Sequence, residues 1–151
     1  MTDSFDPNEF LGATFEEPTD TKRTPCPVGE YNAVAGAPKV RGWETDKNGG
    51  SAGVSFDVPW EIYDQAARDA TGRDKVVVVQ SFTFSFYQGT QEIDKEKAKS
   101  DIRFGKFREA IGLNNDSFSW MQVEGRMAKV KVVHEPYKDT IQDKVGAVTA
   151  V

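Results

Sequence analysis

The sequence predicts an all-β domain with a helical insert, built as a small five-stranded barrel with its helix between strands 3 and 4. Residues 53–64 alternate apolar and polar side chains, the pattern of a strand with one buried face. Residues 75–88 continue this alternation over a longer stretch, with phenylalanine at every second position near its end. Residues 101–111 instead space their large apolar side chains at i, i+3 and i+7, which indicates one face of a helix.

Turn signals separate the strands. The predicted strands are residues 30–43, 53–64, 75–88, 125–137 and 143–151. In the first, Pro38 indicates an edge or a bulge, because proline lacks a backbone N–H. Asn48-Gly49 predicts a tight turn after it. Residues 65–73 predict a short helical turn that ends at Gly72.

The alternation also predicts the core. The side chains expected to be buried are Phe56, Trp60, Phe82, Phe84, Phe86, Phe104, Phe107, Val130 and Val132. Burying one phenylalanine stabilises a fold by about 1.5–3 kcal/mol. Tyr87 has the opposite parity to Phe86, so its ring is expected to stay free. Trp120 is expected to help pack its loop or the end of the helix.

The helical insert has its own start and stop signals. Ser100 is the expected N-cap, and Gly112 is the expected C-terminal stop. Gly105 inside the helix costs about 1 kcal/mol relative to alanine, so close packing is expected there.

The chain of 151 residues suits one domain, residues 29–151, preceded by an acidic, proline-containing arm of residues 1–28. It has no apolar run near the roughly 20 residues that span a bilayer. The acidic start lacks the pattern of a secretory signal. Cys26 is the single cysteine, so a disulfide framework is excluded and a cytoplasmic location is the simplest expectation.

Charge is unevenly distributed along the chain. The formal net charge is −5, and residues 1–24 account for −4 of it. Residues 95–131 hold nine lysines and arginines against five acidic residues. A basic patch is therefore expected despite the acidic total.

Catalytic signatures are missing from the sequence. Phosphate-binding loops, dinucleotide fingerprints and nucleophile elbows are absent. His134 is the only histidine, and we expect it to bond to solvent or a loop. Asp57, Glu61 and Asp64 lie close in sequence and could suggest a metal site, but Asp57 and Glu61 alternate on a solvated strand face. We expect no enzyme, no cofactor and no metal.

A binding module fits the residues better. Proteins that bind single-stranded nucleic acid combine a basic groove with exposed rings, and each stacked base contributes about 1–3 kcal/mol. The candidate DNA-binding residues are Lys39, Arg41, Trp43, Arg73, Lys75, Tyr87, Arg103, Lys106, Lys129 and Lys131. Two alternatives stay open: Lys129 and Lys131 on a merely solubilising sheet face, and Trp43 folded onto the end of the barrel.

Six stretches carry a resemblance. They are PCPVGEYNAV, VPWEIYD, ATGRDKVVVVQSFTF, RFGKFREAIGLN, GRMAKVKVVH and DKVGAV, which cover most of residues 25–149 in order. Together the chain resembles a family of phage-encoded single-stranded DNA-binding proteins with an OB-fold. The resemblance implies an OB-fold-like barrel, a non-catalytic role in phage DNA replication or recombination in the host cytoplasm, and binding across the strand 2–3 face. It also implies single-stranded DNA as the partner. A homo-oligomer and contacts with replication or recombination proteins stay open, and no membrane partner is expected.

A second hypothesis stays open. The chain is then a virion or assembly component, in which the barrel makes protein–protein contacts and the acidic arm ties neighbouring subunits together. DNA binding requires cations beside free rings, whereas assembly requires a complementary patch and an ordered arm. A hydrolase built on His134 is the weakest alternative, because that residue lacks evident partners.

Overall fold

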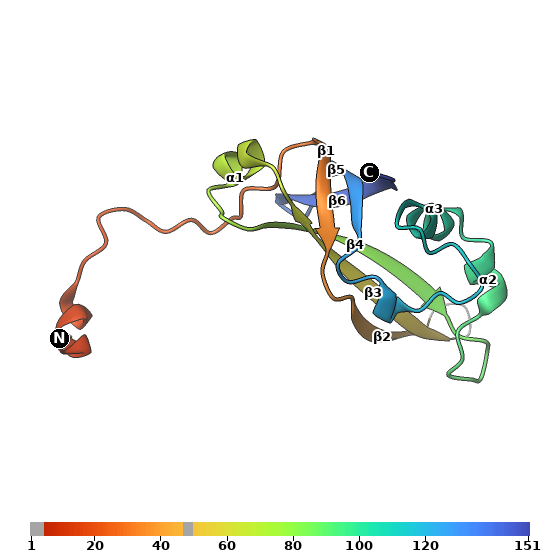
Figure 1. The fold of residues 1–151 in the computed structure, drawn as a ribbon. Coiled ribbons are helices and arrows are strands. Elements are labelled where there is room, and N and C mark those ends of the chain that lie inside the picture. Colours follow the sequence, from red (N-terminus) through yellow and green to blue (C-terminus); the bar gives the residue numbers. More distant parts are fainter. Residues whose placement is uncertain (1–4, 47–49) are drawn as a thin grey trace.

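The computed structural model describes residues 5–46 and 50–151, so the predicted Asn48-Gly49 turn lies outside the described residues. The strands are β1 (Gly29–Ala35), β2 (Lys39–Thr45), β3 (Ser51–Ile62), β4 (Val76–Ser85), β5 (Met127–Tyr137) and β6 (Thr140–Thr149). The helices are η1 (Pro7–Gly12), α1 (Gln65–Thr71), α2 (Lys95–Lys99), α3 (Ile102–Ala110) and η3 (Trp120–Gln122). The protein is therefore mostly β, with few helices (Figure 1).

All six strands belong to one antiparallel sheet. β3 lies at its centre and pairs with β4 from Gly53↔Ser85 to Ile62↔Val76. The other edge of β3 is shared, because β2 pairs with its first half and β1 with its last residues. β1 continues the sheet to β5, and β5 to β6. Over the described residues no ladder joins β4 to β6, so the sheet is not closed.

The predicted first strand, residues 30–43, is in fact two strands. Gly36 donates its N–H to Pro59 O at 2.7 Å, and Pro38 has no N–H to continue the ladder. The chain bends there, and β1 and β2 follow one another along the same edge of β3. The sheet consequently has six strands where five were predicted.

The helices start and stop at identifiable residues. Asp64 caps α1 by accepting the Ala67 N–H at 3.0 Å. The insert holds two helices, α2 and α3. Asp101, and not the predicted Ser100, is the N-cap of α3, and its side chain accepts the Phe104 N–H at 3.1 Å. Gly112 has a φ of 74°, which confirms it as the stop after α3.

The prediction of close packing at Gly105 is wrong. A Cβ built on Gly105 would meet nothing within 4 Å outside its own helix. The glycine therefore weakens α3 without an evident gain in packing.

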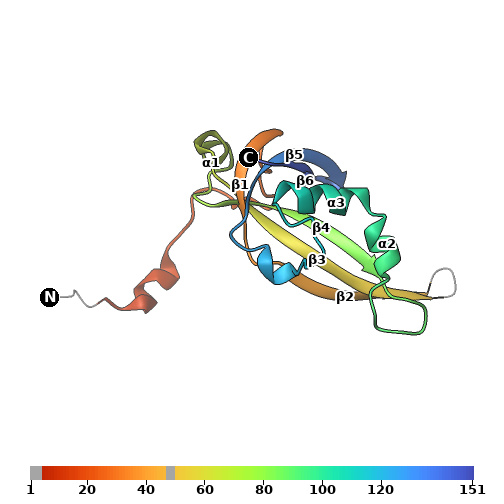
Figure 2. The same ribbon diagram turned by 45° about the vertical axis from the view of Figure 1, so that its right-hand side comes forward.

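The core lies between the inner face of the sheet and α3 (Figure 2). The prediction that the rings at 82, 84, 104 and 107 are buried is confirmed, as it is for Trp60, Val130 and Val132. The Trp60 indole donates to Gln80 Oε1 at 3.1 Å, which satisfies the buried N–H of Trp60 and the side-chain carbonyl of Gln80.

Two predicted core residues are only partly buried. Phe56 lies where β2 and β3 run past the core and is covered by Trp120, whose ring stacks on it at 4.4 Å. Phe86 lies beyond the end of β4 and forms an isolated bridge with Ile93. In both cases periodicity identified the side of the strand that faces the core. It could not show how far along each strand the core continues to bury that side.

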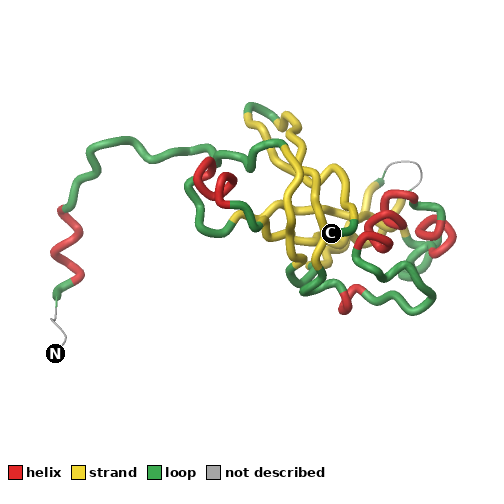
Figure 3. The backbone as a smooth tube through the Cα atoms, turned by 45° about the horizontal axis from the view of Figure 1, so that its top comes forward, coloured by secondary structure: helices red, strands yellow, loops and turns green. Residues whose placement is uncertain are grey.

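The predicted arm divides into two parts. Residues 5–20 run away from the sheet and are exposed throughout (Figures 1 and 3). Residues 21–28 lie against the body instead, where Cys26 is fully buried. Within the described part of the chain, no helix has the length and apolar character needed to cross a membrane.

Candidate nucleic-acid interface

Three strands present one outer surface, here called the hydroxyl face. Its cross-strand rows run through β2, β3 and β4 in register: Lys39–Asp57–Ser81, Arg41–Ser55–Thr83 and Trp43–Gly53–Ser85. Every member points away from the core, because the alternate residues of β4 are the buried phenylalanines. The face thus combines cations and one indole on β2 with small hydroxyl side chains on β3 and β4.

Trp43 lies across Gly53. A Cβ at Gly53 would come within 2.6 Å of Trp43 Cζ2 and 2.0 Å of Phe84 O. A Cβ points out of the sheet, so the indole covers the backbone of β3 where no side chain stands. The Trp43 Nε1–H is buried and has no hydrogen-bond partner among the described residues. This orphan donor makes the present position of the ring less favourable than a position in which the N–H is paired.

The middle of the face is a hydroxyl pair. Ser55 Oγ and Thr83 Oγ1 lie 3.0 Å apart, and Ser55 is only 2% exposed. Sequence reasoning treated these residues as the solvated side of their strands. Their signal in the sequence was the absence of any large side chain between the phenylalanines of β4.

The hydroxyl face carries one ion pair, between Arg41 of β2 and Asp57 of β3. Arg41 Nε lies 3.0 Å from Asp57 Oδ2, and Ser81 Oγ donates to Asp57 Oδ1 at 2.6 Å. The hydrogen bond from Arg41 lowers the pKa of Asp57, although partial burial opposes it. The same hydrogen bond raises the pKa of Arg41. Arg41 therefore stays charged, but its guanidinium is already oriented along the sheet.

Tyr87 lies at the same end of the sheet as Trp43. Phe86 N donates to Ala52 O at 2.8 Å, which fixes the chain leaving β4 against the start of β3. The Tyr87 hydroxyl accepts from Lys95 N at 3.1 Å, and the residue is 38% exposed. The structure thus brings the two candidate stacking rings to one end, although the hydroxyl of Tyr87 is engaged.

Arg103 adjoins the hydroxyl face from α3. Its Nη1 donates to Ser81 O at 2.8 Å, and its guanidinium lies 4.6 Å from the Phe82 ring centre. The side chain thereby occupies the free edge of β4. Lys106, one turn further along α3, lines a groove with Val148 and Thr149 of β6. α3 therefore bridges the gap between β4 and β6, which do not pair with one another.

Lys129 and Lys131 lie on the other half of the sheet. They are exposed on β5 opposite Asn32 and Glu30 of β1, and Lys129 also pairs with Thr149. Because Lys106 also adjoins Thr149, it belongs with this second basic group.

Arg73 and Lys75 lie at the opposite end of β4 from Trp43. At about 3.3 Å per residue along the strand, Lys75 is about 30 Å from the Trp43 row. Lys75 Nζ is 3.6 Å from Glu61 Oε1, so that cation is already paired. Arg73 Nη2 donates to Thr24 O at 3.0 Å and ties the arm to the body.

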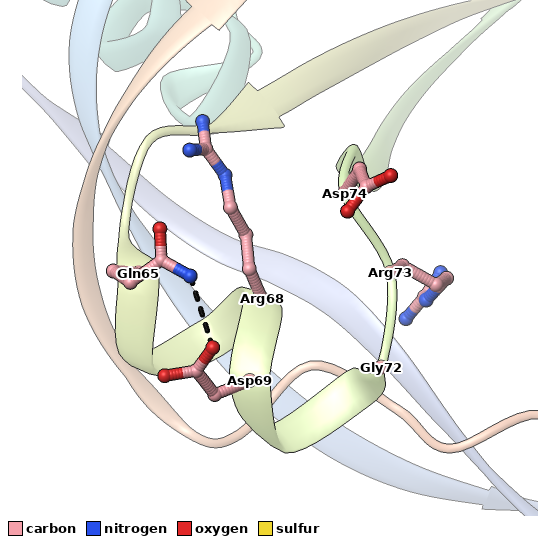
Figure 4. A pocket seen from close by; sticks show the side chains of 6 residues that line it. All are labelled: Gln65, Arg68, Asp69, Gly72, Arg73 and Asp74. Carbon is pink, nitrogen blue, oxygen red and sulfur yellow. Dashed lines mark hydrogen bonds between the residues drawn. The ribbon is translucent and has the colours of Figure 1, made fainter.

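The pocket beside α1 contains Arg73 as well. It is lined by Gln65, Arg68, Asp69, Gly72, Arg73 and Asp74. Figure 4 shows the two guanidinium groups pointing away from one another, a hydrogen bond from Gln65 to Asp69, and Asp74 beside Arg73. Its two cations are balanced by two carboxylates, so this pocket offers no concentrated charge to an anion.

Cys26 and His134 form a structural contact. The His134 Nε2 lies 2.7 Å from Cys26 O, and Cys26 N donates to Asp143 Oδ2 at 2.7 Å. Burial, followed by the nearby Asp143 carboxylate, raises the pKa of the Cys26 thiol. These contacts hold the base of the arm and favour the uncharged, unreactive thiol.

No protein-family model matches the chain, and no curated protein matches it significantly.

Proposed function

We propose that the protein binds single-stranded DNA, with little sequence preference, on the hydroxyl face. The observation that carries this proposal is Trp43 lying over Gly53 beside Arg41. A ring that covers a strand on one side offers its other side to a base, and every base has a face to stack. The neighbouring guanidinium supplies charge for a phosphate, and the small side chains let the strand approach the sheet.

The fold is consistent with an OB-like barrel, and we include this in the proposal. β1 and β2 share one edge of β3, so they act as a single long, bent strand and reduce the six strands to five. The gap between β4 and β6 is covered at one end by Arg23, which bonds to Val77 O and Asp143. α3 covers it at the other end. In such barrels the central strands and adjoining loops bind nucleic acid.

We propose that a longer strand leaves the hydroxyl face past Arg103. The next cations on that course are Lys106, Lys129 and Lys131, which adjoin the same end of β6. A short oligonucleotide would contact the hydroxyl face alone, whereas a long one would reach both groups. The proposed role is to coat single-stranded DNA during phage replication or recombination.

The test is a fluorescence-anisotropy titration with a mixed-sequence oligonucleotide across salt concentration. Binding should weaken with salt, with a log–log slope of about −0.7 for each phosphate neutralised. A duplex of the same length should bind less tightly, because its bases are already stacked. Salt-independent binding, or no binding at low salt, would overturn the proposal.

A further inference from the structure

The exposed part of the arm is acidic and apolar at once. Phe10, Leu11 and Phe15 are 66%, 83% and 88% exposed. Among the residues that the structure describes, the hydrogen bonds of residues 5–16 join them only to one another, through the Asp6 cap of η1 and a Thr14–Glu16 contact. Such apolar exposure on a short, otherwise solvated segment is typical of a segment that packs against another surface.

The body carries a matching apolar groove on the other side of β2, here called the β2 groove. It is lined by Ala37, Pro38, Val40, Phe56, Trp120, Met121 and Glu124 and has a volume of about 320 Å³. Val40 is 62% and Met121 91% exposed, so the groove lacks cover in the monomer. The stacked rings of Phe56 and Trp120 form its floor.

We propose that residues 5–15 of one chain dock in the β2 groove of a second copy of this chain. The arm is directed away from its own sheet (Figures 1 and 3), which presents η1 to a neighbour. Residues 1–20 contain six acidic and no basic residues, so the remaining chain has a formal charge of +1. The remaining chain is nearly neutral, so two arms repel one another more strongly than an arm repels a body.

The area argues for a reciprocal exchange. Aromatic side chains bury about 150–250 Å² each, so one docked arm and its groove remove roughly 1,000 Å² from water. That is below the 1,200–2,000 Å² of a standard stable interface. Two arms exchanged across a twofold axis bury roughly twice as much and reach this range. The expected assembly is a homodimer with exchanged arms.

The first test is sedimentation equilibrium of the full chain. The variant Phe10→Ala/Leu11→Ala should raise the dimer dissociation constant at least tenfold. These residues do not touch the body, so a folding defect is not expected, and Thr14→Ala is the matched arm control. On the groove, Met121→Asp should have the same effect, whereas Ile102→Asp, at another exposed apolar residue, should not. A monomeric wild type, or a dimer insensitive to the arm and groove variants, would overturn the proposal.

Cross-linking determines which chain the arm occupies. Chains carrying Phe10→Cys and chains carrying Met121→Cys are mixed and treated with a short bismaleimide, with Ile102→Cys replacing Met121→Cys as the control. Docking between copies gives a covalent heterodimer only from the first mixture. A double variant that cross-links solely within one chain would overturn docking between copies. Anisotropy with a short oligonucleotide should be unchanged in Phe10→Ala/Leu11→Ala, which separates this interface from the DNA face.

Discussion

The indole of Trp43 lies directly over Gly53 on the neighbouring strand, where a Cβ would approach its Cζ2 to 2.6 Å. The same Cβ would lie 2.0 Å from Phe84 O, a backbone atom that cannot rotate away. The absent side chain at Gly53 is thus what allows both the close pairing of β3 with β4 and the position of the ring. Residue 53 therefore connects stability of the sheet to the candidate site.

Gly53→Ala should destabilise the protein by about 1–3 kcal/mol, because the backbone must shift to admit the methyl group. Gly42→Ala is the control, since its Cβ would meet only Gly53 O at 4.0 Å. The control also accounts for the loss of chain entropy common to both unfolded variants. Urea unfolding measures the two free energies. Equal values would contradict the role assigned to residue 53.

Trp43→Ala should weaken binding to single-stranded DNA by about 1–3 kcal/mol through lost stacking. The salt slope should stay unchanged, because the indole neutralises no phosphate. Tyr137→Ala, at an exposed ring on the β5–β6 turn, should leave the affinity unchanged. Anisotropy titrations at several salt concentrations measure affinity and slope. A weakened affinity with a flatter slope would mean that the variant disturbs Arg41 rather than stacking.

Asp57→Asn should lower the unfolding free energy by about 1 kcal/mol at pH 7, because it weakens the charged hydrogen bonds that the carboxylate accepts from Arg41 and Ser81. The pKa of Asp57 is lowered in the folded state, chiefly by its hydrogen bond with Arg41. Its stabilisation is therefore present above the unfolded pKa of about 3.9 and disappears as pH falls through the lower, folded pKa. The difference between wild type and variant should be constant from pH 5 to 7 and shrink below about pH 4. Urea unfolding across this range checks the sign.

The same variant should tighten DNA binding at low salt. Removing the carboxylate frees Arg41 for a phosphate and removes a negative charge from the hydroxyl face. Ser81→Ala keeps the ion pair and serves as the control. If Asp57→Asn binds more weakly while remaining folded, DNA does not contact this part of the sheet.

Lys129→Ala and Lys131→Ala should act only on long oligonucleotides. Each should flatten the salt slope by about 0.7 on a long strand, since one phosphate contact is lost. On an oligonucleotide near the lower limit of about 4 nucleotides, both variants should match wild type, because such a strand remains on the hydroxyl face. Lys39→Ala should flatten the slope at both lengths. Equal effects of all three variants on the short strand would contradict the proposed course of the DNA.

The apolar pattern predicted much of this structure, because the spacing of apolar residues shows which side of a strand or helix faces the core. The alternation around Phe82 and Phe84 identified the inner side of β4, and the helical spacing of Phe104 and Phe107 identified the docking side of α3. The sequence could not show that residues 30–43 divide into two strands, since Pro38 fits an edge, a bulge or a break equally well. Closure of a barrel depends on long-range pairing between β4 and β6, about which local periodicity carries no information.

The candidate site was predicted less completely than the fold. The choice of basic and aromatic residues correctly included Arg41, Trp43 and Arg103, which lie on or beside the hydroxyl face. Type alone could not separate them from Lys75, whose charge is paired with Glu61 at the far end of β4. Nor could it identify Gly53, whose importance lies in a contact between strands. Such contacts depend on register, which becomes visible only when the strands are paired.

Asp143→Ala should loosen the base of the arm and expose Cys26. The Asp143 side chain is 8% exposed and accepts from both the Arg23 guanidinium and the Cys26 N–H. Its removal leaves the Cys26 N–H without that acceptor, at a cost of about 1–3 kcal/mol. Because Cys26 is the only cysteine, its rate of reaction with a thiol reagent reports local opening of residues 21–28. The rate should rise in Asp143→Ala and remain unchanged in Asp139→Ala, whose carboxylate is 83% exposed in its contact with Lys22. Slow labelling in both variants would show that the packing around Cys26, rather than Asp143, holds the arm across the gap between β4 and β6.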